Sequence, residues 1–241
     1  TPYTADANGN GPAWSNSLFE DNAEYGYGMF IAQDTLREAA ISKAAAVAEA
    51  NADIKPAFDK FMETKNCGKC NKVAAKELID AISKINSDEA KAVLADKAYL
   101  SKKSCWIFGG DGWAYDIGFG GVDHVIASGA DVNILVFDTE VYSNTGGQSS
   151  KSTPTGAIAQ FAAAGKEVKK KDLAAIAMSY GYVYVAQVAQ GANAAQCLKA
   201  FHEAESYHGP SIIIAYAPCI NHGIKGGMSI AQTEEKKAVD S

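Results

Sequence analysis

Arginine is nearly absent from this sequence, since Arg37 is the only arginine among 22 basic residues. A phosphate site built on paired arginine side chains is therefore excluded, because one guanidinium cannot form a clamp. Any phosphate group must be held mainly by backbone N–H groups and by a metal ion.

Long apolar runs are missing as well. No stretch reaches the roughly 18–20 apolar residues of a membrane-spanning helix, and no signal-peptide pattern is visible. The formal net charge of −6 argues against nucleic acid as the main partner. Five cysteines, an odd number, in an acidic chain without a signal pattern indicate a reducing compartment. We therefore expect a cytoplasmic protein with neither a membrane nor a nucleic-acid partner.

The 241 residues suffice for one or two domains with a full core. Residues 1–17 are rich in glycine, proline, asparagine and alanine and predict a loop, whereas residues 18–103 carry alanine-rich helical patterns. The chain starts at Thr1 rather than at a methionine, so we expect a fragment of a longer polypeptide. We divide it into a loop plus a mainly helical segment at 1–104 and an α/β core at 105–241.

Short apolar runs alternate with amphipathic helical patterns in the second half of the chain. The expected strands cover residues 105–108, 133–137, 182–188 and 211–216. Asp172 and Asn193 precede two of the helical patterns and are predicted to be N-caps. This alternation predicts an α/β fold with a parallel sheet flanked by helices, in which ligands bind beyond the carboxyl ends of the strands.

Two polar segments directly follow the first two expected strands. They are GGDGW at residues 109–113, with a helix expected from about 113 to 128, and DTEVYSNTGGQ at residues 138–148. The dinucleotide pattern G-x-G-x-x-G fails, because Tyr115 stands where the third glycine after Gly110 and Gly112 is required. The lysine and hydroxyl residue that end a P-loop are missing too.

The two segments together suit a divalent metal that holds a diphosphate. Asp111 alone would be interpreted as a turn or N-cap aspartate. Thr139 follows the next strand and adds a hydroxyl, and the Val141 carbonyl lies two residues further on. Mg²⁺ prefers such oxygen ligands, which it combines with water and substrate phosphates. The pairing therefore favours a magnesium role for Asp111.

This arrangement resembles the thiamine-diphosphate enzymes, most of which carry asparagine where this chain has Thr139. A closer resemblance is to the single-chain pyruvate:ferredoxin (flavodoxin) oxidoreductases. Its motifs are GDGWAYDIG at 110–118, YSNTGGQ at 142–148 and STPTGA at 152–157. The likeness runs from about residue 17 to the C-terminus and is closest in 106–156 and 216–228.

The resemblance implies a thiamine-diphosphate-binding fold and a role for each matching residue. Asn144 would be the catalytic residue that faces the reacting carbon, and Cys219 would be one of four thiolates on a [4Fe–4S] cluster whose other ligands lie outside this chain. Mg²⁺ would be held by Asp111, Thr139 and the Val141 carbonyl. The cofactor would be held by Gly110, Asp111, Gly112, Trp113, Thr139, Glu140, Val141, Tyr142, Ser143 and Asn144.

The same resemblance implies an activity and a set of partners. Pyruvate would be decarboxylated oxidatively to acetyl-CoA and CO₂, with coenzyme A as acceptor of the acyl group. Electrons would pass through [4Fe–4S] clusters to ferredoxin or flavodoxin. The remaining domains of the parent polypeptide and a second copy in a homodimer would complete the enzyme. The alternatives are another 2-oxoacid:ferredoxin oxidoreductase, for example one acting on 2-oxoglutarate, and a non-catalytic nucleotide-binding module.

Three further motifs allow two interpretations each. Cys67 and Cys70 in CGKC form a surface turn or a redox pair, and a zinc site would need a second cysteine pair. The lysine-rich residues 166–171 form a solvated loop or a dock for an acidic ferredoxin. Asp131 and Asn133 mark a plain strand entry or contribute to a Ca²⁺ site.

Overall fold

The computed structural model describes residues 11–13 and 15–241, so part of the loop expected at 1–17 lies outside the described residues. Its first half is helical, as expected. The elements are η1 (Phe19–Asp21), α1 (Asn22–Ala50), α2 (Lys55–Glu63), α3 (Gly68–Ile82), α4 (Asp88–Ala95) and η2 (Lys97–Tyr99). No helix in 11–13 and 15–241 is both long enough and apolar enough to cross a membrane.

The second half forms the predicted α/β core. Its strands are β1 (Trp106–Gly110), β2 (Asn133–Asp138), β5 (Tyr184–Val188) and β6 (Ser211–Tyr216), with a small hairpin of β3 (Val141–Tyr142) and β4 (Gln148–Ser149). Its helices are η3 (Gly112–Asp116), α5 (Phe119–Ala127), α6 (Leu173–Met178), α7 (Ala194–Ser206), η4 (Gly227–Ile230) and α8 (Ala231–Asp240).

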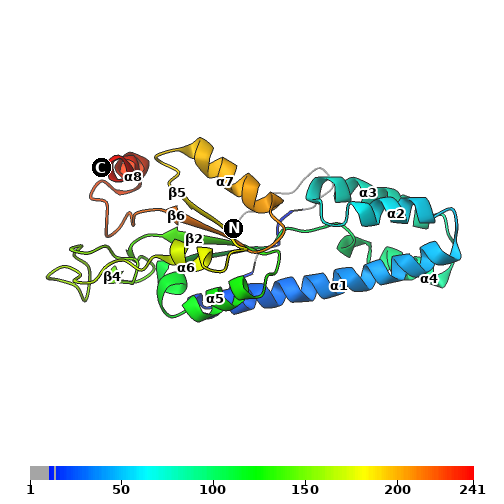
Figure 1. Cartoon of the computed structure of the whole chain (residues 1–241), viewed down its shortest axis with the longest axis horizontal. Coiled ribbons are helices and arrows are strands. Elements are labelled where there is room, and N and C mark those ends of the chain that lie inside the picture. Colours follow the sequence, from blue (N-terminus) through cyan, green and yellow to red (C-terminus); the bar gives the residue numbers. More distant parts are fainter. Residues whose placement is uncertain (1–10, 14) are drawn as a thin grey trace.

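The four long strands form one parallel sheet in the order β1-β2-β6-β5. Side chains alternate between its faces, as a strand requires. Ile134, Val136 and Ile212 face α1, α5 and α6, whereas Leu135 and Ile213 face α7. Figure 1 shows this layered arrangement, with α7 on one side of the strands and α1 and α5 on the other. The predicted fold class is thereby confirmed.

The helical segment has a separate hydrophobic core. Leu78, Ile82 and Phe61 are fully buried there among alanines of α1 and α3. The long helix α1 joins the two regions, because it packs on α5 and β1 and also on α2 and α4. Figure 1 places α2, α3 and α4 at one end of the molecule and the β4 loop and α8 at the other.

The predicted N-caps are confirmed, since Asp172 accepts from the Ala175 N–H at 2.8 Å and Asn193 from the Gln196 N–H at 3.0 Å. The continuous helix expected from about 113 to 128 is wrong. A π-helical turn, η3, comes first, and α5 starts only at Phe119. The buried Trp113 ring explains the break, because it covers Gly109 and Gly118 so closely that a Cβ at either would lie within 2.4 Å of it.

Candidate cofactor and metal site

The two polar segments meet where β1 and β2 end. These strands are parallel neighbours with Gly110 opposite Phe137, so the residues that follow them leave the sheet side by side. The Thr139 hydroxyl lies 3.0 Å from Asp111 Oδ1. Residues 28 positions apart in the sequence are thus brought into direct contact.

The three expected metal-binding oxygens lie together, with the Thr139 hydroxyl between the other two. It lies 2.9 Å from the Val141 carbonyl in addition to its contact with Asp111, and 3.4 Å from the Ser143 hydroxyl. One hydroxyl carries a single proton, so it can donate to only one of these acceptors at a time. A cluster richer in acceptors than in donors is the chemistry that a hard cation such as Mg²⁺ satisfies.

Two serines that were not among the expected site residues complete the environment of Asp111. Ser150 and Ser152 donate to Asp111 Oδ2 at 2.7 and 2.9 Å. The carboxylate is only 2% exposed, and burial raises the pKa of Asp111 while the three hydroxyl hydrogen bonds act in the opposite direction. The S-x-S pattern directly after the second segment is the signal that could have revealed them.

The glycines around Asp111 have different surroundings. A Cβ on Gly112 would lie 2.3 Å from the Tyr142 ring, so that position has no room for a side chain. A Cβ on Gly110 would meet nothing within 4 Å. The backbone at Gly110 therefore borders open space beside the oxygen cluster, and this space fits a diphosphate group that approaches the main chain. The Trp113 side chain is 1% exposed and packs in the core instead.

The loop after Thr139 is held in a specific shape. Glu140 has a left-handed φ of 61°, which few residues other than glycine adopt without support. That support comes from the Thr153 hydroxyl, which donates to the Glu140 carbonyl, and from Lys170, which pairs with its carboxylate at 3.0 Å. Val141 and Tyr142 then pair with β4, and the exposed Asn144 lies in the turn between the two short strands.

The lysine-rich segment supports this loop, so its interpretation as a solvated loop is wrong for three of the four lysines. Lys166 donates to the carbonyls of Ser150 and Thr153 at 2.9 and 2.6 Å. Lys171 donates to the Tyr115 carbonyl at 3.0 Å. Lys169 is exposed. A run of adjacent lysines resembles a surface patch in sequence, and only the fold shows that these ammonium groups satisfy buried carbonyls.

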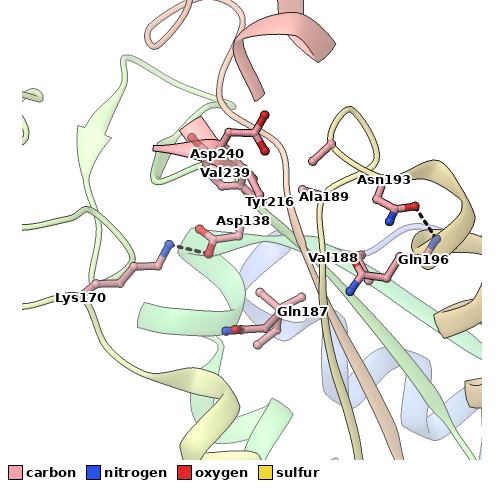
Figure 2. A pocket seen from close by; sticks show the side chains of 12 residues that line it. Asp138, Lys170, Gln187, Val188, Ala189, Asn193, Gln196, Tyr216, Val239 and Asp240 are labelled. Carbon is pink, nitrogen blue, oxygen red and sulfur yellow. Dashed lines mark hydrogen bonds and ion pairs between the residues drawn. The ribbon is translucent and has the colours of Figure 1, made fainter. Parts of the chain in front are cut away.

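Lys170 pairs with a buried carboxylate. It lies 2.6 Å from Asp138 Oδ2, and the Tyr115 hydroxyl donates to the same carboxylate oxygen at 3.0 Å. Burial works against the ammonium, but the carboxylates of Asp138 and Glu140 raise the pKa of Lys170 above its usual value. The pair borders a cavity of about 610 Å³ at the carboxyl ends of β2, β5 and β6 (Figure 2). Tyr216 and Gln187 line this cavity, whereas neither Asp111 nor Thr139 does.

A comparison with known families identifies the domain. A model described as "Thiamine pyrophosphate enzyme, C-terminal TPP binding domain" matches residues 89–215, which is more than half of the chain. The chain belongs to this family. The matched span contains the sheet almost completely, with Asp111, Thr139 and Asn144 inside it and Cys219 just beyond its end.

The chain is also similar to individual curated proteins. It is 57% identical over 255 residues to the pyruvate:ferredoxin oxidoreductase of Moorella thermoacetica, and 53% identical over 244 residues to the pyruvate-flavodoxin oxidoreductase of Klebsiella pneumoniae. Both alignments cover 100% of this chain and 21% of the relative, so the chain spans about a fifth of the length of these proteins.

Among solved structures, a 2-oxoglutarate:ferredoxin oxidoreductase from Magnetococcus marinus is 21% identical with a TM-score of 0.47. The match covers 52% of this chain and 43% of that chain.

Cys219 lies close to the turn between β3 and β4 that carries Asn144. It is buried after β6, with its Sγ 3.2 Å from His222 Nδ1. The His222 ring in turn packs against Gly147, where a Cβ would meet it at 2.6 Å. The segment that carries Cys219 therefore contacts the turn that carries Asn144. In the part of the chain that the structure describes, no three side chains among histidine, cysteine, aspartate and glutamate form a metal cluster.

The Asp131 and Asn133 pair does not fit a Ca²⁺ site. Lys102 Nζ lies 2.7 Å from Asp131 Oδ2, so an ammonium group already neutralises the only carboxylate of the pair. Asn133 is buried at the start of β2 and contributes a single amide oxygen. Ca²⁺ takes six to eight oxygen ligands. The plain strand-entry interpretation accounts for Asp131, whereas Asn133 Oδ1 is buried without a hydrogen-bond partner among the described residues.

Proposed function

We propose that the chain provides the thiamine diphosphate and Mg²⁺ site of a pyruvate:ferredoxin or pyruvate:flavodoxin oxidoreductase. The complete enzyme would convert pyruvate and coenzyme A to acetyl-CoA and CO₂ and pass electrons through [4Fe–4S] clusters. The observation that carries the proposal is the convergence of Asp111, Thr139 and the Val141 carbonyl beside the open backbone at Gly110. The names of the relatives support the substrate and the electron acceptors.

In this proposal each residue has a defined task. Asp111, Thr139 and the Val141 carbonyl hold Mg²⁺, while Ser150 and Ser152 orient the Asp111 carboxylate. The main chain at Gly110, Gly112 and Trp113 and the loop 139–144 hold the diphosphate. When bound, thiamine diphosphate supplies the carbanion chemistry that 2-oxoacid decarboxylation requires.

Two further residues contact the 2-oxoacid and the [4Fe–4S] cluster in this proposal. Asn144 faces the 2-oxoacid from its exposed turn. Cys219 provides one thiolate to a [4Fe–4S] cluster whose other ligands come from outside this chain, because among the described residues no further histidine, cysteine, aspartate or glutamate joins Cys219 and His222 in a metal cluster. The homodimer and the cytoplasmic location belong to the same proposal.

A chimera tests the function directly. The corresponding fifth of the Moorella enzyme is replaced by this chain, and pyruvate-dependent ferredoxin reduction is measured. We expect activity with pyruvate, and a loss of at least about 100-fold in the Asp111→Ala chimera, because the metal loses its only carboxylate ligand. Asp88→Ala is the matched control, since Asp88 is an exposed carboxylate on α4.

Other results would overturn parts of the proposal. Activity with 2-oxoglutarate but not with pyruvate would reassign the substrate. The 241-residue chain is also titrated with thiamine diphosphate by calorimetry, with and without Mg²⁺. If Asp111→Ala left Mg²⁺-dependent binding unchanged, the chain would be a nucleotide-binding module of another kind.

A further inference from the structure

Two cysteines of the helical segment lie together at the start of a long helix. Cys67 is the N-cap of α3, and Cys70 lies in its first turn. Cys67 Sγ accepts a hydrogen bond from the Cys70 N–H at 3.1 Å. Both are free thiols, Cys67 half-buried and Cys70 exposed. Gly68, directly after Cys67, borders a small cavity with Lys102, Asp131 and Asn133 at the amino end of β2. The cofactor loops follow the carboxyl ends of β1 and β2, so the cysteine pair lies away from that site.

The fold holds this pair in position. The Cys67 carbonyl accepts from the N–H of Asn71 at 2.8 Å, and Asn71 itself is fully buried. The Asn71 side-chain oxygen accepts from the Lys102 N–H at 2.6 Å and from Arg37 at 3.3 Å. The first turn of α3 is therefore anchored to two other parts of the chain. The extended backbone of Cys67, with φ −92° and ψ 111°, directs its sulfur over that turn towards Cys70.

The two sulfurs have different chemistry. A hydrogen bond from the Cys70 side chain, and then that from the Cys70 N–H, lower the pKa of Cys67, whereas the neighbouring Cys67 raises the pKa of Cys70. The first turn of α3 contains no acidic residue, so nothing there opposes the positive end of the helix dipole. Elsewhere, burial raises the pKa of Cys105 to about 11 and also raises the pKa of Cys197. An attacking thiolate next to a resolving thiol is the arrangement that exchanges disulfides.

We propose that Cys67 and Cys70 form a thiol–disulfide exchange site that reacts with low-molecular-weight disulfides. The Cys67 thiolate attacks one sulfur of the disulfide RSSR, which breaks the S–S bond, forms a Cys67–S–SR mixed disulfide and releases RS⁻. The Cys70 thiol then loses its proton and attacks the Cys67 sulfur, which forms the Cys67–Cys70 disulfide and releases a second RS⁻. The cysteine pair is oxidised by two electrons, and RSSR is reduced to two RSH.

The test uses the 241-residue chain and oxidised glutathione. In the wild-type chain we expect a loss of two hydrogens in intact mass and a Cys67–Cys70 cross-link in peptide mass spectrometry. Cys105 and Cys197 remain free thiols and are the internal controls. In Cys70→Ser the reaction stops at a glutathione adduct on Cys67. This adduct forms at least about 10-fold faster than the adduct on Cys70 in Cys67→Ser, because the backbone N–H of residue 70 still stabilises a thiolate at the N-cap position, which residue 70 does not occupy.

Both variants are expected to fold. Serine at position 67 is itself a good N-cap, and position 70 is exposed. Far-UV circular dichroism checks this for each variant. Equal adduct rates in the two variants would overturn the proposal, and so would a wild-type chain that accumulates two glutathione adducts without the cross-link or keeps both thiols free.

Discussion

The helical segment and the sheet region both bury apolar side chains while satisfying their backbone hydrogen bonds, but they do so differently. The helical segment satisfies its backbone within each helix and buries leucine, isoleucine and alanine between helices. The sheet buries both of its faces. Because β1 and β2 are parallel neighbours, the residues that follow them lie side by side and no longer form hydrogen bonds within the sheet. Polar groups gather at these ends and need partners. The candidate cofactor site therefore lies at the carboxyl ends of β1 and β2, while the helical segment carries the cysteine pair.

The largest loss of stability is expected from a cavity in the helical core, and it tests whether the two hydrophobic cores unfold separately. Leu78→Ala removes a fully buried side chain from the helical core and should cost about 2–5 kcal/mol. Hydrogen exchange followed by mass spectrometry should show faster exchange in α2, α3 and α4 than in β2 and β6.

Ile134→Ala is the matched change in the sheet core, and it should reverse this pattern. If Leu78→Ala accelerated exchange equally in both regions, α1 would join them into one cooperative unit and the comparison would fail.

A smaller loss of stability is expected when the ion pair between Lys170 and Asp138, beside the loop after Thr139, is removed. Lys170→Met leaves the Asp138 carboxylate, 5% exposed, without its cation and should cost about 1–3 kcal/mol near neutral pH. The pKa of Lys170 is raised, so this contribution is fully present below the usual lysine value of about 10.4 and is lost as the pH rises through the higher folded value.

Urea unfolding measures this loss. Adding Asp138→Asn to Lys170→Met should restore part of the stability, because the unpaired charge is removed. A double variant that is less stable than the single one by the full cost of a second deletion would show that the two residues act independently.

The smallest change in stability is expected from Lys171, the next residue in the chain. Burial, and then the nearby Lys151, lower the pKa of Lys171 to about 8. Between that value and about 10.4 the unfolded chain binds more protons than the folded one at this site, so stability should rise with pH. Lys171→Met should remove this rise, and the lost hydrogen bond to the Tyr115 carbonyl should cost about 1 kcal/mol near neutral pH. Urea unfolding at a series of pH values checks it, and a rise that persists in the variant would contradict the assignment.

Several elements were predictable because their signals are local. Asp172 and Asn193 precede apolar helical patterns and are N-caps, and the strands beginning at Asn133 and Ser211 start where the apolar runs start. The break in the helix after Gly112 was not predictable, since it depends on the Trp113 ring packing over Gly109 and Gly118. Local propensity does not register a contact of that kind.

The sequence by itself determined that polar residues follow two neighbouring apolar strands, and that Asp111, Thr139 and Val141 are the candidates for a metal. It determined this because strand ends and residue types are local properties. Only the tertiary structure decided that Ser150 and Ser152 orient Asp111 and that Lys166, Lys170 and Lys171 turn inward to hold the loop. The reason is physical, since these partners meet through the packing of a loop against strand ends, and sequence spacing does not encode that approach.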